Sequence, residues 1–314
     1  MKEKLNIVFM GTPLFAKIVL ERLLKDYSVV CIVSQPDKEK TRKNKLLMTK
    51  TKEVAIIHNI DILQPHFIKD SVDEIISYQP DLIITCAYGQ FIPKKLLEYP
   101  RYGCINVHGS LLPKYRGGAP IHHAIINGEE KTGITIMYMS LAMDAGDIIN
   151  QEEIRIEESD NLDSLYNKLA ILGGELLVKT IPLIVANKVN RIIQNENEVT
   201  YGYNITKEEE KINFNNKMIN VYNQVRGLNS NPGAYTIFAG KIMKVYNTVM
   251  VKEASDKNIG EIVRIDKDGI VVKVLDGLIK ITDLKIEGKK RMSARDYLNS
   301  VHNKEELVGV MLGK

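Results

Sequence analysis

Strand-like and helix-like segments alternate through the first 190 residues, and this alternation restricts the chain to a small set of folds. Apolar runs typical of strands cover 5–10, 27–34, 61–65, 81–88, 104–108, 132–140 and 147–156. Apolar residues at helical spacing occupy 14–27, 71–79, 119–128 and 161–188. Strands that alternate with helices are typical of parallel sheets, because each helix returns the chain to the same edge. The pattern therefore predicts an α/β domain with a largely parallel sheet.

The pattern changes near residue 190, where a polar stretch predicts a linker. Strand-like runs separated by Gly, Asp and Asn then follow at 234–240, 241–251, 260–265, 269–274 and 277–286. Asp-Gly dipeptides at 268–269 and 276–277 are typical of hairpins. Such runs are typical of a small β-barrel or sandwich. We therefore expect an α/β domain at 1–189, a linker at 190–206 and a β domain at 207–314.

The composition is that of a globular protein, with 44% hydrophobic and 26% charged residues. No apolar run approaches the ~18 to 20 residues that a membrane-spanning helix needs, and the first residues lack the features of a signal peptide. Cys31, Cys86 and Cys104 lie in or beside apolar runs and form no C-x-x-C pair, so reduced, buried thiols are expected. We therefore expect a cytoplasmic protein without a membrane partner.

Positive charge is concentrated in two parts of the chain. The formal net charge is only +4, but residues 38–52 (KEKTRKNKLLMTKTK) contain seven basic residues and one acidic residue. Residues 201–314 contain 19 basic and 14 acidic residues. Clustered Lys and Arg are typical of proteins that bind a phosphate-rich partner. A solvated, lysine-rich surface is the alternative interpretation of the same charge.

A polar pair ends one of the apolar runs. Asn106 and His108 are two residues apart in the run 104–108, so their side chains lie on one face of the predicted strand. At the carboxyl edge of a parallel sheet, both would face the crevice in which α/β proteins bind ligands. An amide and an imidazolium are both hydrogen-bond donors, and two converging donors stabilise a developing oxyanion. Taken alone, such a pair is more often a turn-capping Asn and a core His.

The residues around this pair favour the functional interpretation. Gly109 lets the backbone approach a ligand, residues 110–113 form a partly apolar turn, and RGGAP at 116–120 leads into a helix. Asp144 lies in a glycine-containing loop, MDAGD, between two predicted strands. An Asp in such a loop is usually a turn residue. Beside an imidazole, however, it can accept a proton and keep the ring charged.

These motifs resemble the signature of the folate-dependent formyltransferases, carried here by NVHGSLLPKYRGGAP at 106–120 and MDAGD at 143–147. The similarity covers nearly the whole chain. Further matching segments are IVFMGTPLFA at 7–16, SQPD at 34–37 and AYGQFIP at 87–93. Two more segments resemble the branch of the family that acts on tRNA, namely QVRGLNSNPGAY at 224–235 and GKKRMSARDYL at 288–298.

The resemblance implies both a fold and a reaction. The fold is an N-terminal Rossmann-like formyltransferase domain with a largely parallel sheet, followed by a C-terminal OB-like β-barrel that binds tRNA. The reaction transfers the formyl group of 10-formyltetrahydrofolate, a co-substrate, to the free α-amino group of initiator methionyl-tRNA. The product is N-formylmethionyl-tRNA for translation initiation. No metal is required, no clustered His/Cys/Asp set has metal-ligand spacing, and a monomer is expected.

The same resemblance assigns roles to residues at matching positions. The catalytic residues are Asn106, His108 and Asp144. The folate-binding turn comprises Ser110, Leu111, Leu112 and Pro113, and the folate-contacting segment comprises Ala87, Tyr88, Gly89, Gln90, Phe91 and Ile92. The tRNA-binding residues are Arg42, at the key arginine position, with Lys38, Lys40, Lys43 and Lys45. The loop that carries them lacks the glycines and the proline usual in the family, so its charge is kept but its path is not predicted.

The sequence is also compatible with other functions. The same core serves formyltransferases that act on glycinamide ribonucleotide or on amino sugar nucleotides, and the sugar enzymes can also carry a C-terminal barrel. Hydrolysis of the formyl donor to formate would use water as the acceptor. A nucleic-acid-binding protein without activity would not need Asn106, His108 and Asp144. The basic loop and the GKKRMSARDYL segment favour tRNA as the acceptor over each of these.

Overall fold

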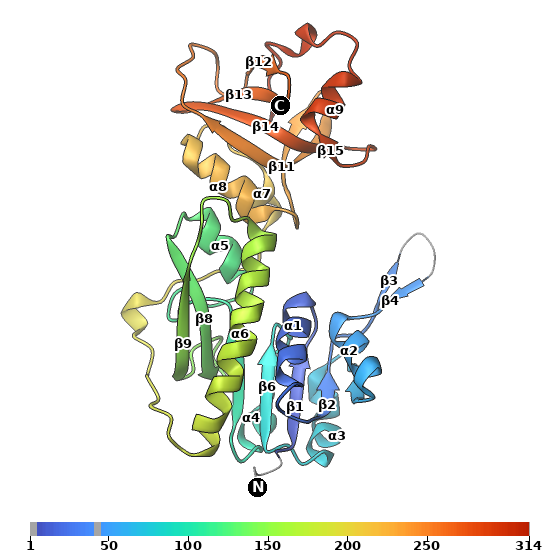
Figure 1. Cartoon of the computed structure of the whole chain (residues 1–314), viewed down its shortest axis with the longest axis vertical. Coiled ribbons are helices and arrows are strands. Elements are labelled where there is room, and N and C mark those ends of the chain that lie inside the picture. Colours follow the sequence, from blue (N-terminus) through green and yellow to red (C-terminus); the bar gives the residue numbers. More distant parts are fainter. Residues whose placement is uncertain (1–4, 41–44, 314) are drawn as a thin grey trace. The chain divides into compact units, whose positions relative to one another are not determined.

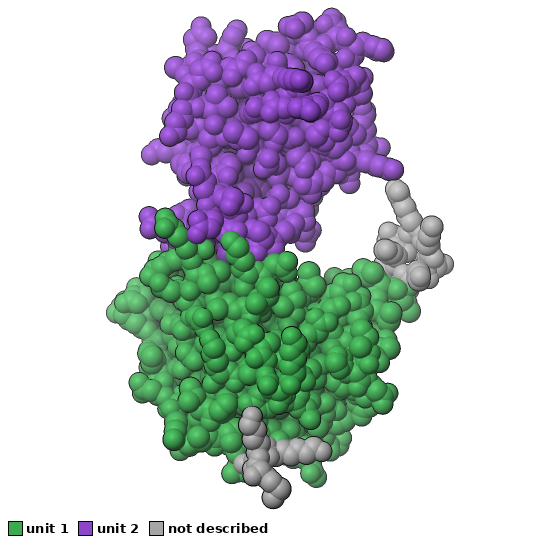
Figure 2. All heavy atoms as spheres, viewed as in Figure 1, with its two compact units in different colours: residues 1–120, 131–155, 166–203 green, residues 121–130, 156–165, 204–314 purple. Residues whose placement is uncertain are grey.

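The computed structural model describes residues 5–40 and 45–313 of the chain. These residues pack into two compact units, which Figure 2 shows in different colours. Unit 1 comprises residues 1–120, 131–155 and 166–203, and unit 2 comprises residues 121–130, 156–165 and 204–314. Two short segments from the first 190 residues therefore belong to the second unit. The predicted domain boundaries at 189 and 206 stay a prediction.

Unit 1 is built on a sheet that, within the described residues, has seven strands (Figure 1). In spatial order they are β5 (Asp61–Leu63), β2 (Val29–Val33), β1 (Ile7–Gly11), β6 (Leu82–Cys86), β7 (Cys104–His108), β8 (Lys131–Tyr138) and β9 (Ile148–Arg155). Pairing is parallel from β5 to β7, and antiparallel where β8 and β9 continue the sheet. The predicted largely parallel sheet is confirmed.

Helices follow the strands, as the alternation predicts. They are α1 (Leu14–Leu23), α2 (Lys50–His58), the 3-10 helix η1 (Ile68–Ser71), α3 (Val72–Ser77), α4 (Lys94–Glu98), α5 (Pro120–Ile126), α6 (Leu162–Val185) and the 3-10 helix η2 (Glu196–Glu198). Glycines let α6 lie close to its neighbours. A Cβ at Gly173 would be 3.0 Å from Val107 of β7, and one at Gly174 would be 2.8 Å from Arg22 of α1. Among the residues that the structure describes, none of the helices combines the length and apolarity needed to span a membrane.

The basic loop forms an antiparallel hairpin of β3 (Lys38–Lys40) and β4 (Lys45–Leu47). Figure 1 shows that this hairpin extends away from the sheet of unit 1. Leu46 and Leu47 are exposed on it. The hairpin therefore presents apolar as well as basic groups.

Unit 2 carries an antiparallel sheet. Its strands, in spatial order, are β10 (Ala234–Phe238), β11 (Lys241–Val251), β14 (Gly277–Ile286), β13 (Gly269–Val274) and β12 (Ile262–Asp266), with β15 (Met292–Ser293) paired to β14. The accompanying helices are α7 (Lys207–Glu210), α8 (Met218–Leu228), α9 (Ala294–Asn299) and the 3-10 helix η3 (Glu305–Leu307).

The segment after η3 joins the two outer strands of this sheet. Ile262 of β12 donates its N–H to the Val310 carbonyl at 2.9 Å, and Gly313 donates to the Ile237 carbonyl of β10 at 2.9 Å. Backbone groups on both outer strands therefore find partners in one segment, which covers the open edges of the sheet. The antiparallel, barrel-like domain predicted from the sequence is confirmed.

Both Asp-Gly dipeptides lie at hairpins, as predicted. Asp266 pairs with Gly269 at the turn between β12 and β13, and Val274 pairs with Gly277 at the turn between β13 and β14. The glycines therefore begin the returning strands. A Cβ at Gly269 would lie 2.4 Å from Lys280 Cγ, so a larger residue there would require Lys280 to move.

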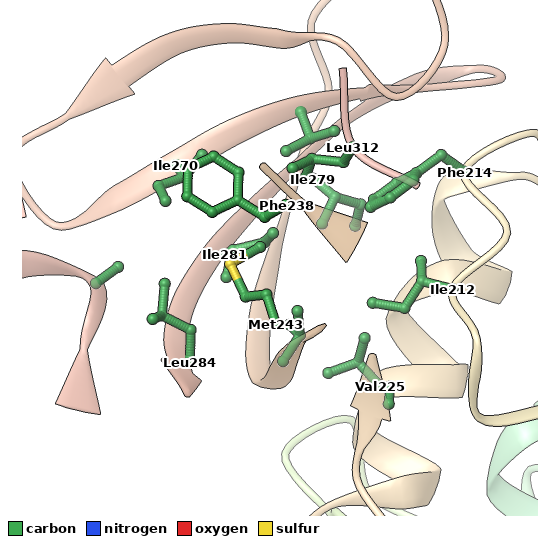
Figure 3. Packing of buried hydrophobic residues seen from close by; sticks show 14 of the residues in the cluster. Ile212, Phe214, Val225, Phe238, Met243, Ile270, Ile279, Ile281, Leu284 and Leu312 are labelled. Atoms are coloured by element: carbon green, nitrogen blue, oxygen red, sulfur yellow. The ribbon is translucent and has the colours of Figure 1, made fainter. Parts of the chain in front are cut away.

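Apolar side chains of this sheet meet in one core (Figure 3). Phe238, Met243 and Ile270 are among its members, and they come from three different strands. On β14, Ile279 and Ile281 are fully buried, whereas the residue between them is partly exposed. This alternation is expected for a strand with one face on a core.

Shortening Ile281 to Ala tests this core. The change removes buried methyl and methylene groups and leaves a cavity, which typically lowers the free energy of unfolding by about 2–5 kcal/mol. Ile242→Ala is the matched control, because Ile242 is 43% exposed on β11, and its loss should be under about 1 kcal/mol. Chemical denaturation followed by circular dichroism measures both variants. Equal losses would contradict the placement of Ile281.

Candidate active site

Two neighbouring parallel strands end at the same edge of the unit 1 sheet. Thr85 of β6 pairs with Asn106 of β7, and the strands are followed by loops at 87–92 and 109–119. Asn106 and His108 occupy alternate positions of β7 and share a face. Ligands of α/β proteins bind outside the carboxyl ends of the strands, so these loops and side chains define the candidate site.

Asn106 presents a directed hydrogen-bond donor. Thr85 Oγ1 donates to Asn106 Oδ1 at 2.9 Å. This bond fixes the amide oxygen on Thr85, so the Nδ2 group points the other way. No described residue accepts a hydrogen bond from Nδ2, and Asn106 is only partly buried. Its N–H groups are therefore available to a ligand.

His108 is buried at the end of β7, and both ring nitrogens have polar neighbours. Nε2 lies 3.0 Å from the carbonyl oxygen of Tyr115. Because a carbonyl oxygen only accepts, Nε2 carries the hydrogen. Nδ1 lies 3.7 Å from Asp144 Oδ2, which is longer than a hydrogen bond. A proton on Nδ1 therefore belongs to the charged form of the ring, and the Asp144 carboxylate lies on the Nδ1 side of that ring.

Asp144 comes from the loop between β8 and β9. Its Oδ2 atom accepts a hydrogen bond from the Gly117 N–H at 2.8 Å. Its backbone has φ = +49°, in the left-handed region that is uncommon for residues other than glycine. The contact with Gly117 keeps the carboxylate beside His108. The structure thus brings together two of the predicted residues that are far apart in the sequence.

These groups provide two donors and one carboxylate at one point of the sheet edge. Asn106 Nδ2 and Nδ1 of a charged His108 can both donate to an oxyanion, and Asp144 can accept a proton. Such an arrangement suits the attack of an amine on a carbonyl carbon. Within the described part of the chain, no group of three or more His, Cys, Asp or Glu residues could hold a metal ion.

The turn at 110–113 follows His108 directly. Ser110 Oγ donates to the Lys114 carbonyl at 2.6 Å, which closes the turn. Leu112 is buried in a small apolar cluster, so the expected apolar rim does not include its side chain, and Leu112 can reach a ligand only through its backbone. Leu111 and Pro113 are partly exposed, and they are the apolar groups of the turn that a ligand can contact.

The loop after β6 exposes backbone donors. Ala87 has φ = +48° and Gly89 has φ = +87°. No described residue accepts from the N–H groups of Tyr88, Gly89 or Gln90. Unpaired N–H groups beside the strand ends can bind the polar edge of a flat heterocycle. This loop therefore offers backbone donors to a polar ligand.

Side chains of the same loop set its shape. Tyr88 is buried, and burial raises the pKa of its hydroxyl to about 12. Gln90 Oε1 accepts from the Ile68 N–H at 2.8 Å. Ile92 is also buried, whereas Phe91 is 77% exposed. Tyr88, Gln90 and Ile92 therefore anchor the loop, and Phe91 is the side chain most open to a ligand.

Three of the predicted tRNA-binding residues, Lys38, Lys40 and Lys45, belong to the β3–β4 hairpin. Lys38 is exposed. Lys40 and Lys45 are opposite one another in the hairpin register. Arg42 and Lys43 lie outside the described residues.

Some groups that hold the site are not among the predicted residues. Thr85 orients Asn106, the Tyr115 carbonyl accepts from His108, and the Gly117 N–H donates to Asp144. Thr85 could have been found from the sequence, because it is a polar residue inside an apolar strand. The groups of Tyr115 and Gly117 belong to the backbone, and their side chains give no such signal.

Comparison with known proteins shows the family to which this chain belongs. Residues 5–181 match the family model described as Formyl transferase, and residues 204–302 match the one described as Formyl transferase, C-terminal domain. The chain belongs to the formyl transferase family. It is therefore a transferase with the two regions that the sequence motifs predict.

Curated relatives of known activity are similar to this chain over its full length. A methionyl-tRNA formyltransferase of Bacillus cytotoxicus is 49% identical over 314 residues, which covers 99% of each chain. A methionyl-tRNA formyltransferase of Bacillus cereus is 48% identical with the same coverage. The similarity is full-length, so it includes both units.

Solved structures share the fold at lower identity. HypX from Aquifex aeolicus in complex with tetrahydrofolic acid gives a TM-score of 0.68 at 17% identity, over 94% of this chain and 47% of that one. An N-formyltransferase from Helicobacter canadensis, in complex with folinic acid and dTDP-3-aminofucose, gives 0.67 at 20% identity, over 92% and 100%. At these identities the likeness shows the fold alone.

Gly146 tests the geometry of the Asp144 loop. A Cβ at this position would lie 1.8 Å from the Tyr138 carbonyl oxygen, so Gly146→Ala must push the loop away from β8. We expect the rate of formyl transfer to fall by about 10-fold or more, because displacing a reacting group by about 1 Å can cost about 10²-fold. Steady-state kinetics and thermal denaturation measure the change. A variant with unaltered rate and stability would contradict the close approach.

Proposed function

We propose that this chain transfers the formyl group of 10-formyltetrahydrofolate to the α-amino group of initiator methionyl-tRNA. The product is N-formylmethionyl-tRNA, which serves translation initiation. One observation carries the proposal: His108 faces Asp144 beside the directed amide of Asn106. This site lies in a chain that is 49% identical over its length to a methionyl-tRNA formyltransferase.

The nucleophile is the neutral α-amine of the methionyl group. A free α-amine has a pKa of about 7.7–8, and esterification of the carboxyl group lowers it, so much of the amine is neutral near pH 7. No covalent intermediate with the protein is needed. Cys31, Cys86 and Cys104 are free but buried, and burial raises the pKa of each thiol, which disfavours the nucleophilic thiolate.

Negative charge develops on the formyl oxygen as the amine attacks the formyl carbon. Asn106 Nδ2 and the Nδ1–H of charged His108 would donate hydrogen bonds to that oxygen. Loss of one such donor typically lowers the rate by about 10²–10³. Thr85 and the Tyr115 carbonyl already orient these two side chains, so little reorganisation is needed during the reaction.

Asp144 has two tasks in this mechanism. Its carboxylate lies 3.7 Å from Nδ1 and would pair with the imidazolium that offers the Nδ1–H donor. It also accepts the proton that the attacking amine loses and passes it to N10 of the folate, as the bond between the formyl carbon and N10 breaks. The bond from Gly117 fixes Oδ2 near the ring, so one carboxylate serves both purposes from one position.

The formyl donor would lie against the two loops of the sheet edge. Residues 87–92 would bind the polar edge of its ring through backbone N–H groups, and Leu111 with Pro113 would contact an apolar part. When bound, the donor supplies a formyl group attached to its N10 nitrogen.

The tRNA would be bound by basic groups through its phosphates. Residues 38–52 carry seven basic residues against one acidic residue, and Lys38 is exposed on the hairpin. The basic excess of residues 201–314 supports a second contact region. Phosphate contacts supply affinity and register rather than base identity.

An amino sugar nucleotide is the alternative acceptor. The N-formyltransferase from Helicobacter canadensis, solved with dTDP-3-aminofucose, shares the fold. The charge of residues 38–52 favours a polyanion over such a small acceptor. Full-length similarity to methionyl-tRNA formyltransferases supports the same choice.

The proposal includes a cytoplasmic location and a monomeric state. The free, buried cysteines support a reducing compartment. Size-exclusion chromatography with light scattering tests the monomer, and a dimer at micromolar concentration would contradict it.

Asn106→Ala and His108→Ala test the oxyanion donors. Each should lower kcat for formyl transfer by about 100-fold or more, because a donor to the developing charge is lost, while binding of methionyl-tRNA stays unchanged. Asn303→Ala and His58→Ala are matched controls, since both residues are exposed and distant in the sequence from the site. Formylation kinetics and filter binding give the two readouts. Parallel loss of binding and activity would indicate a structural role instead.

Arg42→Ala tests the basic loop. A lost charged contact to tRNA should lower kcat/KM for methionyl-tRNA by about 10-fold, and affinity for the formyl donor should stay the same. Lys25→Ala is the control, because Lys25 is an exposed basic residue outside the loop. Kinetics with varied tRNA and varied donor separate the two effects. An unchanged response to tRNA would reject the assignment of Arg42.

A further inference from the structure

Residues 192–202, called the strap below, are bonded to the loops of the candidate site. Ile192 exchanges two backbone hydrogen bonds with Ile148 of β9, at 2.8 and 2.9 Å. Farther along, the Gly202 N–H donates to the Arg116 carbonyl at 2.8 Å. The polar sequence predicts a linker here, but these contacts make the strap part of unit 1.

The strap also binds the buried side chain of Arg116, which is 4% exposed. Nε and Nη2 of the guanidinium donate to Gln194 Oε1 at 3.0 and 2.9 Å. Nη2 forms an ion pair with Glu196 at 2.8 Å. An arginine side chain only donates hydrogen bonds, so the Gln194 amide must turn its oxygen toward Arg116.

The nitrogen of the same amide binds the Asp144 loop, residues 139–147. Gln194 Nε2 donates to the carbonyl oxygens of Asp144 and Gly146, both at 2.8 Å. Gln194 is only 5% exposed, so water does not compete for these bonds. Both amide hydrogens and the amide oxygen have partners, and the orientation of the side chain is therefore fixed.

The loop needs this support because of the backbone at Asp144. A positive φ at a residue other than glycine persists only where surrounding contacts impose it, and Asp144 has φ = +49°. The Gly117 N–H binds its carboxylate, and Gln194 binds its carbonyl. Asp144 is thus fixed at two points, and Gly117 adjoins the arginine that orients Gln194.

We propose that Gln194 is a positioning residue for formyl transfer, whose amide keeps the Asp144 carboxylate against His108. The inference rests on the proposed function, in which the Asp144 carboxylate faces the imidazole of His108 and accepts the proton of the amine. Among the described residues, the Gln194 side chain has hydrogen bonds to the carbonyls of this loop and to Arg116, and none to His108. It therefore acts through Asp144.

Gln194→Glu isolates this role, because the new side chain keeps its size and an oxygen for Arg116. Its second oxygen would face two carbonyl oxygens that now accept from Nε2, so the Asp144 loop must move away. We expect kcat for formyl transfer to fall about 10- to 100-fold. KM for methionyl-tRNA and for the formyl donor should stay near the original values, because the Gln194 side chain is buried and is not open to a substrate.

Glu196→Gln is the matched control for this variant. Glu196 contacts the same Arg116 but not the Asp144 loop, and its side chain is 72% exposed. The amide that replaces the carboxylate keeps an oxygen that can accept from Arg116, so kcat should stay within about threefold. A loss in Glu196→Gln equal to that in Gln194→Glu would overturn the proposal.

A double variant shows whether Gln194 acts through Asp144 or has a general structural role. The double variant Gln194→Glu with Asp144→Asn should be no slower than Asp144→Asn alone, because Gln194 acts through Asp144. Additive losses, or an unchanged kcat in Gln194→Glu, would overturn the proposal.

Amide hydrogen exchange gives a readout that does not depend on the acceptor. Gln194→Glu should speed exchange in residues 139–147 and leave β6 unchanged, and unaltered exchange in 139–147 would overturn the positioning role. If the unsubstituted protein does not formylate methionyl-tRNA, the proposed function fails. The exchange result then still decides whether Gln194 holds the loop.

Discussion

The site depends on His108 being held between a carbonyl and a carboxylate. The Tyr115 carbonyl accepts a hydrogen bond from the Nε2–H of His108. The ring can therefore offer a second donor, on Nδ1, only in its charged form. The Asp144 carboxylate, which would pair with that form, lies 3.7 Å from Nδ1. The Thr85 hydroxyl orients Asn106 on the same face of β7, and the Gly117 N–H holds the Asp144 carboxylate in place. The parallel sheet contributes by ending β6 and β7 at the same edge.

Most of the fold could be predicted from apolar periodicity. Residues 104–108, 241–251, 269–274 and 277–286 are strands over the predicted bounds, because each places at least one face on a core. The helix α2 and the β3–β4 hairpin were not predicted. The hairpin is rich in lysine and exposes its leucines, so no buried face imposes a period on its sequence.

The site could be predicted only in part. Asn106, His108 and Asp144 carry motifs that a sequence displays, although their roles stay proposals. The groups that orient them are backbone atoms of Tyr115 and Gly117, which any residue would supply. The strap has a polar sequence like that of a linker, because its partners are distant in the sequence. Only the folded chain brings those partners together.

A transfer assay with the purified protein is the most direct test of the proposed formyl transfer to initiator methionyl-tRNA. It would offer 10-formyltetrahydrofolate with initiator methionyl-tRNA, with uncharged tRNA, or with water alone, and would measure formyl-methionine on the tRNA. Formylation is expected only with the charged tRNA, at a rate that depends on Asn106, His108 and Asp144. Consumption of the donor without formylated tRNA would contradict it, and would make a sugar nucleotide, another small amine or water the acceptor.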